Sequence, residues 1–144
     1  LGGTKDIAAW RTVADAAIVA IGNNVLRQQL QQQLIQAGYT LATVIHPRAV
    51  VSPSANLGVG SAIMAGAIIG TEAKLGMGVI VNSGAVVDHH CVVEDYGHLG
   101  VAAAMAGGTQ LGAGAWMQAG SALGYGVKVL PGVILPPGSV FKSE

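Results

Sequence analysis

Apolar positions recur with a period of six residues between residues 44 and 139. The segment divides into sixteen consecutive hexapeptides without insertion or deletion, and the sixth position of each is small or is Val, Thr or Cys. The second position is always aliphatic: Ile45, Val51, Leu57, Ile63, Ile69, Leu75, Val81, Val87, Val93, Leu99, Met105, Leu111, Met117, Leu123, Val129 and Leu135. A six-residue period fits neither an α-helix nor an alternating strand, but it is typical of a solenoid whose units each supply one short strand and one turn.

Three such units would close a triangular coil of about 18 residues, with the second-position side chains stacked inside and small sixth-position residues where the interior narrows. Of the 22 glycines, sixteen occupy the third or fifth position, where the chain must turn and where positive φ costs glycine little. The repeat therefore predicts a parallel β-helix of about five coils in residues 44–144, with a continuous aliphatic core.

Residues 1–43 follow a different pattern. The apolar run 16–21 ends at Gly-Asn-Asn and predicts a buried strand and a turn. Leu recurs every fourth residue among glutamines over 26–34, which predicts an amphipathic helix with a solvated glutamine face, and residues 40–44 predict a second strand. One strand-helix-strand unit cannot cover both faces of a sheet, so we interpret 1–43 as the C-terminal part of a small Rossmann-like α/β domain. Because the chain opens without Met, we expect it to be a fragment of a longer protein.

Composition excludes several classes of function. Seven Lys or Arg balance seven Asp or Glu, and charged residues make up 10% of the chain, so no basic face is available to follow a nucleic acid backbone. The apolar runs stop well short of the roughly 18 residues that would span a bilayer, so we expect no membrane insertion. A single Cys and the lack of a signal-peptide pattern favour the cytoplasm.

The candidate chemistry lies in a cluster of three histidines. His89 and His90 occupy the fourth and fifth positions of their unit, so their side chains should point outward at a corner, and His98 follows one unit later. An outward imidazole can act as a general base near neutral pH. With 18 residues per coil, Thr71 lies directly below His89 and Gly107 directly above it. The bare wall at Gly107 would leave a slot beside the base for a thin chain such as pantetheine.

A zinc site is a competing interpretation, because trimeric carbonic anhydrases share this type of solenoid and bind zinc with three histidines. Their ligands come from matched positions on neighbouring coils, whereas the spacings among His89, His90 and His98 are one, eight and nine residues. We therefore predict no metal. Cys91 falls at a sixth position and should be buried as a small apolar residue, which makes it a poor nucleophile.

Several short motifs resemble those of one bacterial enzyme family. They are Ile21-Gly22-Asn23-Asn24 followed by Arg27, His46-Pro47, Val51-Ser52-Pro53-Ser54-Ala55, Asn82, Asp88-His89, His98 and Ala106-Gly107-Gly108. The family is that of the sugar acetyltransferases of the hexapeptide-repeat type, which includes sialic-acid O-acetyltransferases and nucleotide 4-amino-sugar N-acetyltransferases. The resemblance implies a left-handed β-helix, although parallel crossovers are generally right-handed.

The resemblance also implies ligands, assembly and residue roles. It implies a nucleotide-sugar substrate, acetyl-CoA as co-substrate, and a homotrimer with acetyl-CoA in the groove between neighbours. His89 matches the general base, with His90 beside it. The other matched positions are His98, Gly107, Ala119 and Pro137 for acetyl-CoA, and Gly22, Asn23, Asn24 and Asn82 for the nucleotide sugar.

The chain departs from the family pattern at His90, where many relatives have a Glu or Asp that strengthens the base. A neutral imidazole cannot stabilise a His89 cation as a carboxylate would. Either Asp88, Glu94 or Asp95 takes that role, or His89 works as a weaker base.

We predict an enzyme that moves acetyl from acetyl-CoA to the amine of a nucleotide-linked amino sugar, in one step and with His89 as general base. The resemblance alone favours an amine over a hydroxyl acceptor, so a sialic-acid-type sugar O-acetyltransferase stays open. So does an inactive trimeric solenoid scaffold, for the chain as it stands.

Overall fold

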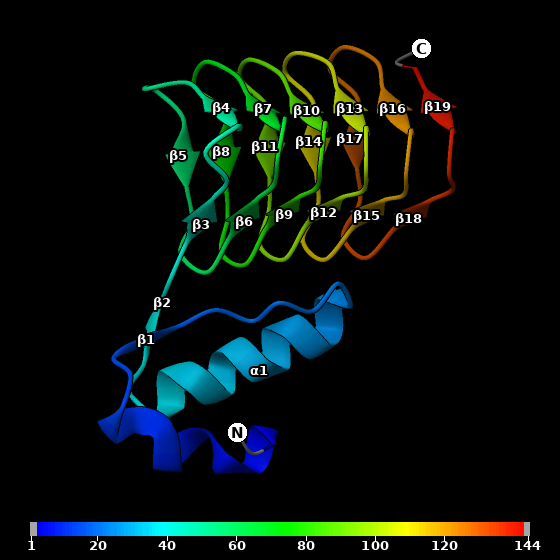
Figure 1. The fold of residues 1–144 in the computed structure, drawn as a ribbon. Helices are drawn as coiled ribbons and strands as arrows, with labels where there is room; N and C mark the ends of the chain where they lie inside the picture. Colours follow the sequence, from blue (N-terminus) through cyan, green and yellow to red (C-terminus); the bar gives the residue numbers. More distant parts are fainter. Residues whose placement is uncertain (1–2, 143–144) are drawn as a thin grey trace.

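The structure, a computed structural model, describes residues 3–142; residues 1–2 and 143–144, the outer ends of the two predicted segments, lie outside the described residues. A short N-terminal segment lies beneath a triangular solenoid in Figure 1. That segment contains the 3-10 helix η1 (Thr4–Thr12), strand β1 (Ala16–Ala17), helix α1 (Asn24–Gln36) and strand β2 (Thr40–Leu41).

The solenoid consists of two-residue strands arranged in three parallel sheets, each named here by its first strand. The β3 sheet contains β3 (Val44–Ile45), β6 (Ala62–Ile63), β9 (Ile80–Val81), β12 (His98–Leu99), β15 (Trp116–Met117) and β18 (Ile134–Leu135). The β4 sheet contains β4 (Val50–Val51), β7 (Ile68–Ile69), β10 (Val86–Val87), β13 (Ala104–Met105), β16 (Ala122–Leu123) and β19 (Val140–Phe141). The β5 sheet contains β5 (Asn56–Leu57), β8 (Lys74–Leu75), β11 (Val92–Val93), β14 (Gln110–Leu111) and β17 (Lys128–Val129).

The strand register confirms the six-residue repeat and the 18-residue coil. Each strand pairs with the strand one coil further on, as Val86 pairs with Ala104 and Val87 with Met105. From Ile63 to Leu135 the second-position side chains form one continuous core, together with buried sixth-position residues such as Ala67 and Cys91. In the first coil Val51 and Leu57 are only partly buried against this core, and Ile45 is exposed, because no earlier coil covers that end of the solenoid. The parallel β-helix predicted from the sequence is therefore confirmed.

The turns between sheets form three edges of the prism. The β3/β4 edge contains residues 46–49, 64–67, 82–85, 100–103, 118–121 and 136–139. The β4/β5 edge contains residues 52–55, 70–73, 88–91, 106–109 and 124–127. The β5/β3 edge contains residues 58–61, 76–79, 94–97, 112–115 and 130–133. These three names locate every site residue below.

The fifth position of each unit generally adopts a left-handed conformation. Ten of these positions are glycines with φ between +64° and +72°, a region that costs glycine little. Four are other residues held at φ between +54° and +59°: Glu72, His90, Tyr96 and Ala102. Such a conformation costs a residue with a Cβ roughly 1–2 kcal/mol, so these four positions are locally strained.

The N-terminal segment has the predicted strand-helix-strand order, with β1 and β2 paired in parallel. The first strand is shorter and more exposed than predicted. The glutamine face of α1 is not fully solvated, because Gln31 is 0% exposed and its Nε2 donates to the Gly60 carbonyl at 2.9 Å. Leu30 and Leu34 are buried, while Leu26 is exposed. One side of the helix is thus docked on the β5/β3 edge through polar contacts.

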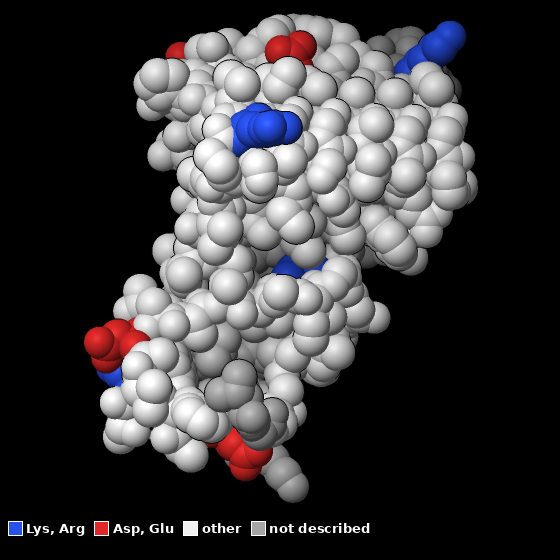
Figure 2. Space-filling model, viewed as in Figure 1, with Lys and Arg blue, Asp and Glu red and all other residues white. Residues whose placement is uncertain are grey.

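Charged side chains are few and scattered on the face of the molecule shown in Figure 2. Within residues 3–142, no helix has both the length and the apolar character needed to cross a membrane.

Candidate active site

The structure places the predicted site residues on three different edges. His89, His90 and Gly107 lie on the β4/β5 edge. His98 lies on β12 and meets the Gly22 turn at the β5/β3 edge. The remaining three predicted residues, Asn82, Ala119 and Pro137, lie on the β3/β4 edge. Within one chain the fold therefore brings His98 to Gly22, Asn23 and Asn24, but it does not bring the predicted base to them.

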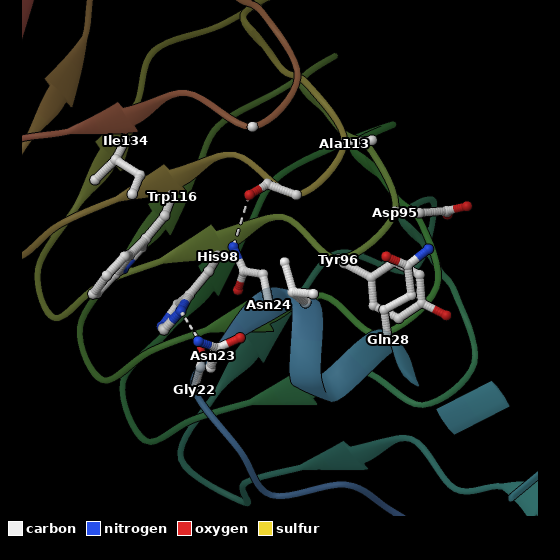
Figure 3. A pocket seen from close by; sticks show the side chains of 13 residues that line it. Gly22, Asn23, Asn24, Gln28, Asp95, Tyr96, His98, Ala113, Trp116 and Ile134 are labelled. Carbon is white, nitrogen blue, oxygen red and sulfur yellow. Dashed lines mark hydrogen bonds between the residues drawn. The ribbon is translucent and has the colours of Figure 1, made fainter. Parts of the chain in front are cut away.

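A cleft of about 750 Å³ separates the start of α1 from the solenoid. Its walls include Gly22, Asn23, Tyr96, His98, Trp116 and Ile134. Figure 3 shows His98 and Trp116 on one side of the cleft and Gln28, Asp95 and Tyr96 on the other. The mixture of stacked rings, backbone groups and few charges suits an organic ligand that carries both flat and polar parts.

Arg27 fixes the position of the cleft wall contributed by α1. Its side chain is 1% exposed, and burial lowers the pKa of its guanidinium to about 10, an effect that the nearby Tyr96 partly opposes. The guanidinium donates to the carbonyls of Gly78 at 2.7 Å and Tyr96 at 2.9 Å on the solenoid. It also donates to the carbonyls of Ile21 and Gly22 in the turn. One buried side chain thereby ties the turn before α1 to the solenoid edge.

The two asparagines predicted to bind the nucleotide sugar hold the turn itself. The Asn23 side chain accepts from the backbone N–H of Leu26 at 2.9 Å and caps α1. The Asn24 side chain donates to the Gly114 carbonyl at 2.8 Å and accepts from Arg27. The side-chain oxygens of both residues are therefore engaged within the protein, and their predicted contact with a nucleotide sugar stays a prediction.

His98 is a neutral hydrogen-bond acceptor in the wall of the cleft. It is 6% exposed and stacks on Trp116 with ring centroids 5.3 Å apart. Burial, and secondly the charge of Arg27, lower the pKa of His98 to about 4, although its bond to Gly22 works in the opposite direction. Because the Gly22 carbonyl can only accept, Nδ1 carries the proton and Nε2 keeps a free lone pair.

Two further side chains in the cleft were not singled out from the sequence. Trp116 has a buried Nε1 with no hydrogen-bond partner among the described residues, so a bound acceptor could satisfy it. Tyr96 sits over Gly78 in a strained left-handed conformation. Burial and the nearby Asp95 raise the pKa of its hydroxyl, an effect that Arg27 partly opposes.

Protonation of His98 should destabilise the protein in mild acid. Below its ordinary value of about 6.5 the unfolded chain takes up a proton at His98, whereas the folded chain does so only near 4. The unfolded state then binds more protons, so stability falls as the pH decreases from 6.5 towards 4. We expect a loss of about 2 kcal/mol in the free energy of unfolding between pH 7 and pH 5.

Urea unfolding at both pH values, at one protein concentration, measures this loss. His98→Gln has no such titration and should lose about 2 kcal/mol less than the wild type over the same interval. Equal losses in the two proteins would show that His98 is not held neutral by the fold.

The predicted base lies outside this cleft, exposed on the β4/β5 edge. The structure confirms that Gly107 lies one coil beyond His89, since the N–H of Gly108 donates to the His89 carbonyl at 3.0 Å. A side chain at position 107 would overlap the His89 imidazole. The left-handed glycine is Gly108, with φ +67°, and not Gly107. The space that glycine leaves at position 107 is thus occupied by the His89 imidazole, with its Nε2 against the Gly107 backbone, and the pantetheine slot expected there stays a prediction.

The histidines and the cysteine of the described residues are arranged as follows. Within residues 3–142, no three His, Cys, Asp or Glu side chains are grouped in a way that could hold a metal ion. Cys91 is buried as predicted, with its Sγ 3.2 Å from the Ala106 carbonyl oxygen and 3.2 Å from Thr109 Oγ1.

Comparison with solved structures links this fold and cleft to one class of enzyme. A mutant of the GDP-perosamine N-acetyltransferase from Caulobacter crescentus, solved with CoA and GDP-perosamine, is 39% identical with a TM-score of 0.96. The alignment covers 98% of this chain and 68% of that one. The acetyltransferase domain of PglB from Neisseria gonorrhoeae FA1090, solved with acetyl coenzyme A, is 33% identical with a TM-score of 0.74, over 99% of this chain and 75% of that one.

A curated relative matches over a shorter stretch. The UDP-N-acetylbacillosamine N-acetyltransferase of Bacillus subtilis (strain 168) is 46% identical over 48 residues, which is 33% of this chain and 22% of that protein. No family model matches the chain.

The fold is that of the left-handed β-helix acyltransferases. Within that class, the chain belongs to the nucleotide-sugar N-acetyltransferases of the hexapeptide-repeat family.

Proposed function

We propose that the protein transfers acetyl from acetyl-CoA to the amine of a nucleotide-linked amino sugar. The observation that carries this proposal is the TM-score of 0.96, at 39% identity, to an N-acetyltransferase solved with CoA and a GDP-amino sugar. His89 Nε2 accepts the proton as the amine attacks the thioester carbonyl carbon. An amide bond forms, the carbon–sulfur bond breaks, and the thiolate leaves with that proton as CoA thiol.

We propose a homotrimer as the working assembly, because the predicted site residues lie on separate edges of one chain. A neighbouring subunit could place its β4/β5 edge, with His89, beside the cleft at the β5/β3 edge of the first. The outward positions of the β4 sheet suit such a contact, since all are apolar: Val50, Ile68, Val86, Ala104, Ala122 and Val140. On the β5 sheet, by contrast, four of the five outward side chains are polar: Asn56, Lys74, Gln110 and Lys128. An apolar sheet face of this kind is usually covered.

Sedimentation at micromolar concentration should therefore give three times the mass of one chain. Ile68→Glu on the β4 sheet should shift the protein towards monomer, because the charge would be buried without a partner. Lys74→Glu, the matched change on the β5 sheet, should leave the trimer intact. A monomeric wild type, or dissociation by both variants alike, would contradict this assembly.

An activity screen tests the function itself. UDP-, GDP- and CMP-linked sugars, each with an amine or a hydroxyl at the same carbon, are offered with acetyl-CoA, and release of CoA thiol is followed. We expect thiol release with at least one amino sugar and not with its hydroxyl counterpart. Release with the hydroxyl sugars alone would identify an O-acetyltransferase, and no release would favour a scaffold. We place the reaction in the cytoplasm, where an enzyme would meet acetyl-CoA.

A further inference from the structure

The carboxylate of Glu72 is linked to the predicted base, His89, through the side chain of His90. The Nδ1 atoms of His89 and His90 lie 2.9 Å apart, with the two rings in an edge-to-face arrangement. The Nε2 atom of His90 lies 3.1 Å from Oε2 of Glu72, which occupies the same position of the repeat one coil earlier. The three side chains form a continuous line along the β4/β5 edge.

The hydrogen-bonding capacity of each group fixes the protons along this line. An ionised Glu72 can only accept, so Nε2 of His90 must carry a proton. In a neutral His90 the other nitrogen, Nδ1, is then an acceptor, and Nδ1 of His89 must donate to it. A neutral His89 is left with its lone pair on Nε2, the edge that lies against Gly107. Glu72 thereby selects the tautomer in which His89 can receive a proton beside the bare wall.

Local strain at both ends of the contact supports a functional origin. Glu72 and His90 are two of the four residues with a Cβ that take the left-handed conformation used by glycine at ten equivalent turns. Both side chains are more than half exposed, so an ion pair between them adds little to stability in the single chain. A strained, exposed pair that contributes little to folding is the pattern expected where function requires the side chains.

The carboxylates considered from the sequence are engaged elsewhere. Asp88 Oδ1 accepts from the backbone N–H of His89 itself at 2.7 Å. Glu94 accepts from Gln110 and from the N–H of Ala113, and Asp95 accepts from the N–H of Met77. The last two lie on the β5/β3 edge, away from His89. Among the described residues, none of these three carboxylates accepts a hydrogen bond from the His89 imidazole, whereas Glu72 is connected to it through His90.

We propose that Glu72 is a positioning residue for His89 and acts through His90, so that the Glu72–His90–His89 line replaces the carboxylate that many relatives have directly after the base. This inference rests on the proposed acetyl transfer for its effect on rate. As the amine loses its proton to His89 Nε2, the positive charge on the His pair is stabilised by Glu72. When the thiolate leaves and takes that proton, the line returns to its starting state.

Tautomers measured by ¹H–¹⁵N NMR test the line without any turnover. In the wild type at neutral pH, His89 should carry its proton on Nδ1, the less common tautomer, and His90 on Nε2. Glu72→Gln keeps an acceptor oxygen and should keep both tautomers. Glu72→Gly removes the acceptor and should let both rings relax towards the ordinary mixture. A wild-type His89 protonated on Nε2, or tautomers unchanged in Glu72→Gly, would overturn the proposal even if the enzyme is active.

Kinetics test the role of the charge. Glu72→Gln should lower kcat by about 10- to 100-fold with little change in the KM for acetyl-CoA, the size usual for a residue that orients another. Without the carboxylate the protonated His pair is less stable, so the acidic limb of the kcat/KM profile should move to lower pH. Among residues 3–142, the titratable side chains with a recorded contact to the pair are Glu72 and Asp88, and Tyr125 lies one coil beyond Gly107 in the repeat. If kcat and the acidic limb of the kcat/KM profile were both unchanged in Glu72→Gln, the charge of Glu72 would have no role in the reaction.

Stability separates this role from a structural one. Glu72→Gly relieves a left-handed conformation, so its melting temperature should equal or exceed that of the wild type while kcat falls. Ala102→Gly makes the same backbone change on the β3/β4 edge and calibrates the effect on melting temperature. A fall in kcat that accompanies a clearly lower melting temperature in Glu72→Gly, but not in Ala102→Gly, would assign Glu72 to folding instead.

Discussion

Replacing Arg27 by Met should release helix α1 and the turn before it from the solenoid. The Met side chain retains the aliphatic part of Arg27 but removes every donor that reaches the carbonyls of Gly78 and Tyr96. Each buried acceptor left without a partner costs about 1–3 kcal/mol. Removal of the charge offsets part of this cost, because burial disfavours the charged form of the Arg27 guanidinium. We expect a net loss of about 3 kcal/mol in the local stability of α1, within the range for such changes.

Hydrogen exchange measures this loss residue by residue. Backbone amides of α1 should lose about 100-fold in protection, whereas amides of the solenoid core strands should change little. Arg48→Met removes an exposed Arg from the solenoid and serves as the control for the loss of one charge. Full protection of α1 in Arg27→Met would mean that apolar contacts alone hold the helix in place. The cleft should be lost with the helix, because Gly22 and Asn23 form part of its wall.

The solenoid could be predicted from the sequence because one local rule repeats in every unit. An aliphatic second position such as Val87 and a small sixth position such as Cys91 fill the core of their own coil. They do so independently of the sequence elsewhere in the chain. The docking of α1 could not be predicted in this way. Gln31 belongs to the glutamine face that the sequence predicts to be solvated, and Arg27 appears in the sequence only as part of a motif. Both side chains are buried against the β5/β3 edge, where they donate to the carbonyls of Gly60 and Gly78.

The sequence did contain a signal for Glu72. The 18-residue coil that stacks Gly107 on His89 also stacks His90 on Glu72, and both are residues with a Cβ at a turn position where glycine is usual. The stacking of His90 on Glu72 can be inferred only after the solenoid has been assigned, because it depends on the coil length and on φ at the fifth position. No local sequence pattern predicts that the site residues lie on three different edges. That arrangement depends on which faces of the prism take part in the site.

His89→Ala should lower kcat by about 10²- to 10⁴-fold, the range for loss of a general base. The affinity for acetyl-CoA should hardly change, because the imidazole acts on a proton that moves only in the transition state. The solenoid should fold normally, since His89 is exposed and its backbone conformation is not among the strained ones. Steady-state kinetics, together with calorimetric titration by acetyl-CoA, separate these two effects.

His46→Ala is the matched control, because His46 is also exposed but lies more than two coils away on the β3/β4 edge. It should keep wild-type turnover. If His89→Ala retained near-normal turnover while the wild type acetylates an amino sugar, the base would have to lie elsewhere. His98 is the histidine in the wall of the cleft, and burial together with the charge of Arg27 lowers its pKa to about 4. A pKa near 4 makes it a far weaker base than an exposed imidazole, so its contribution at neutral pH would be to accept a hydrogen bond and not to remove the proton.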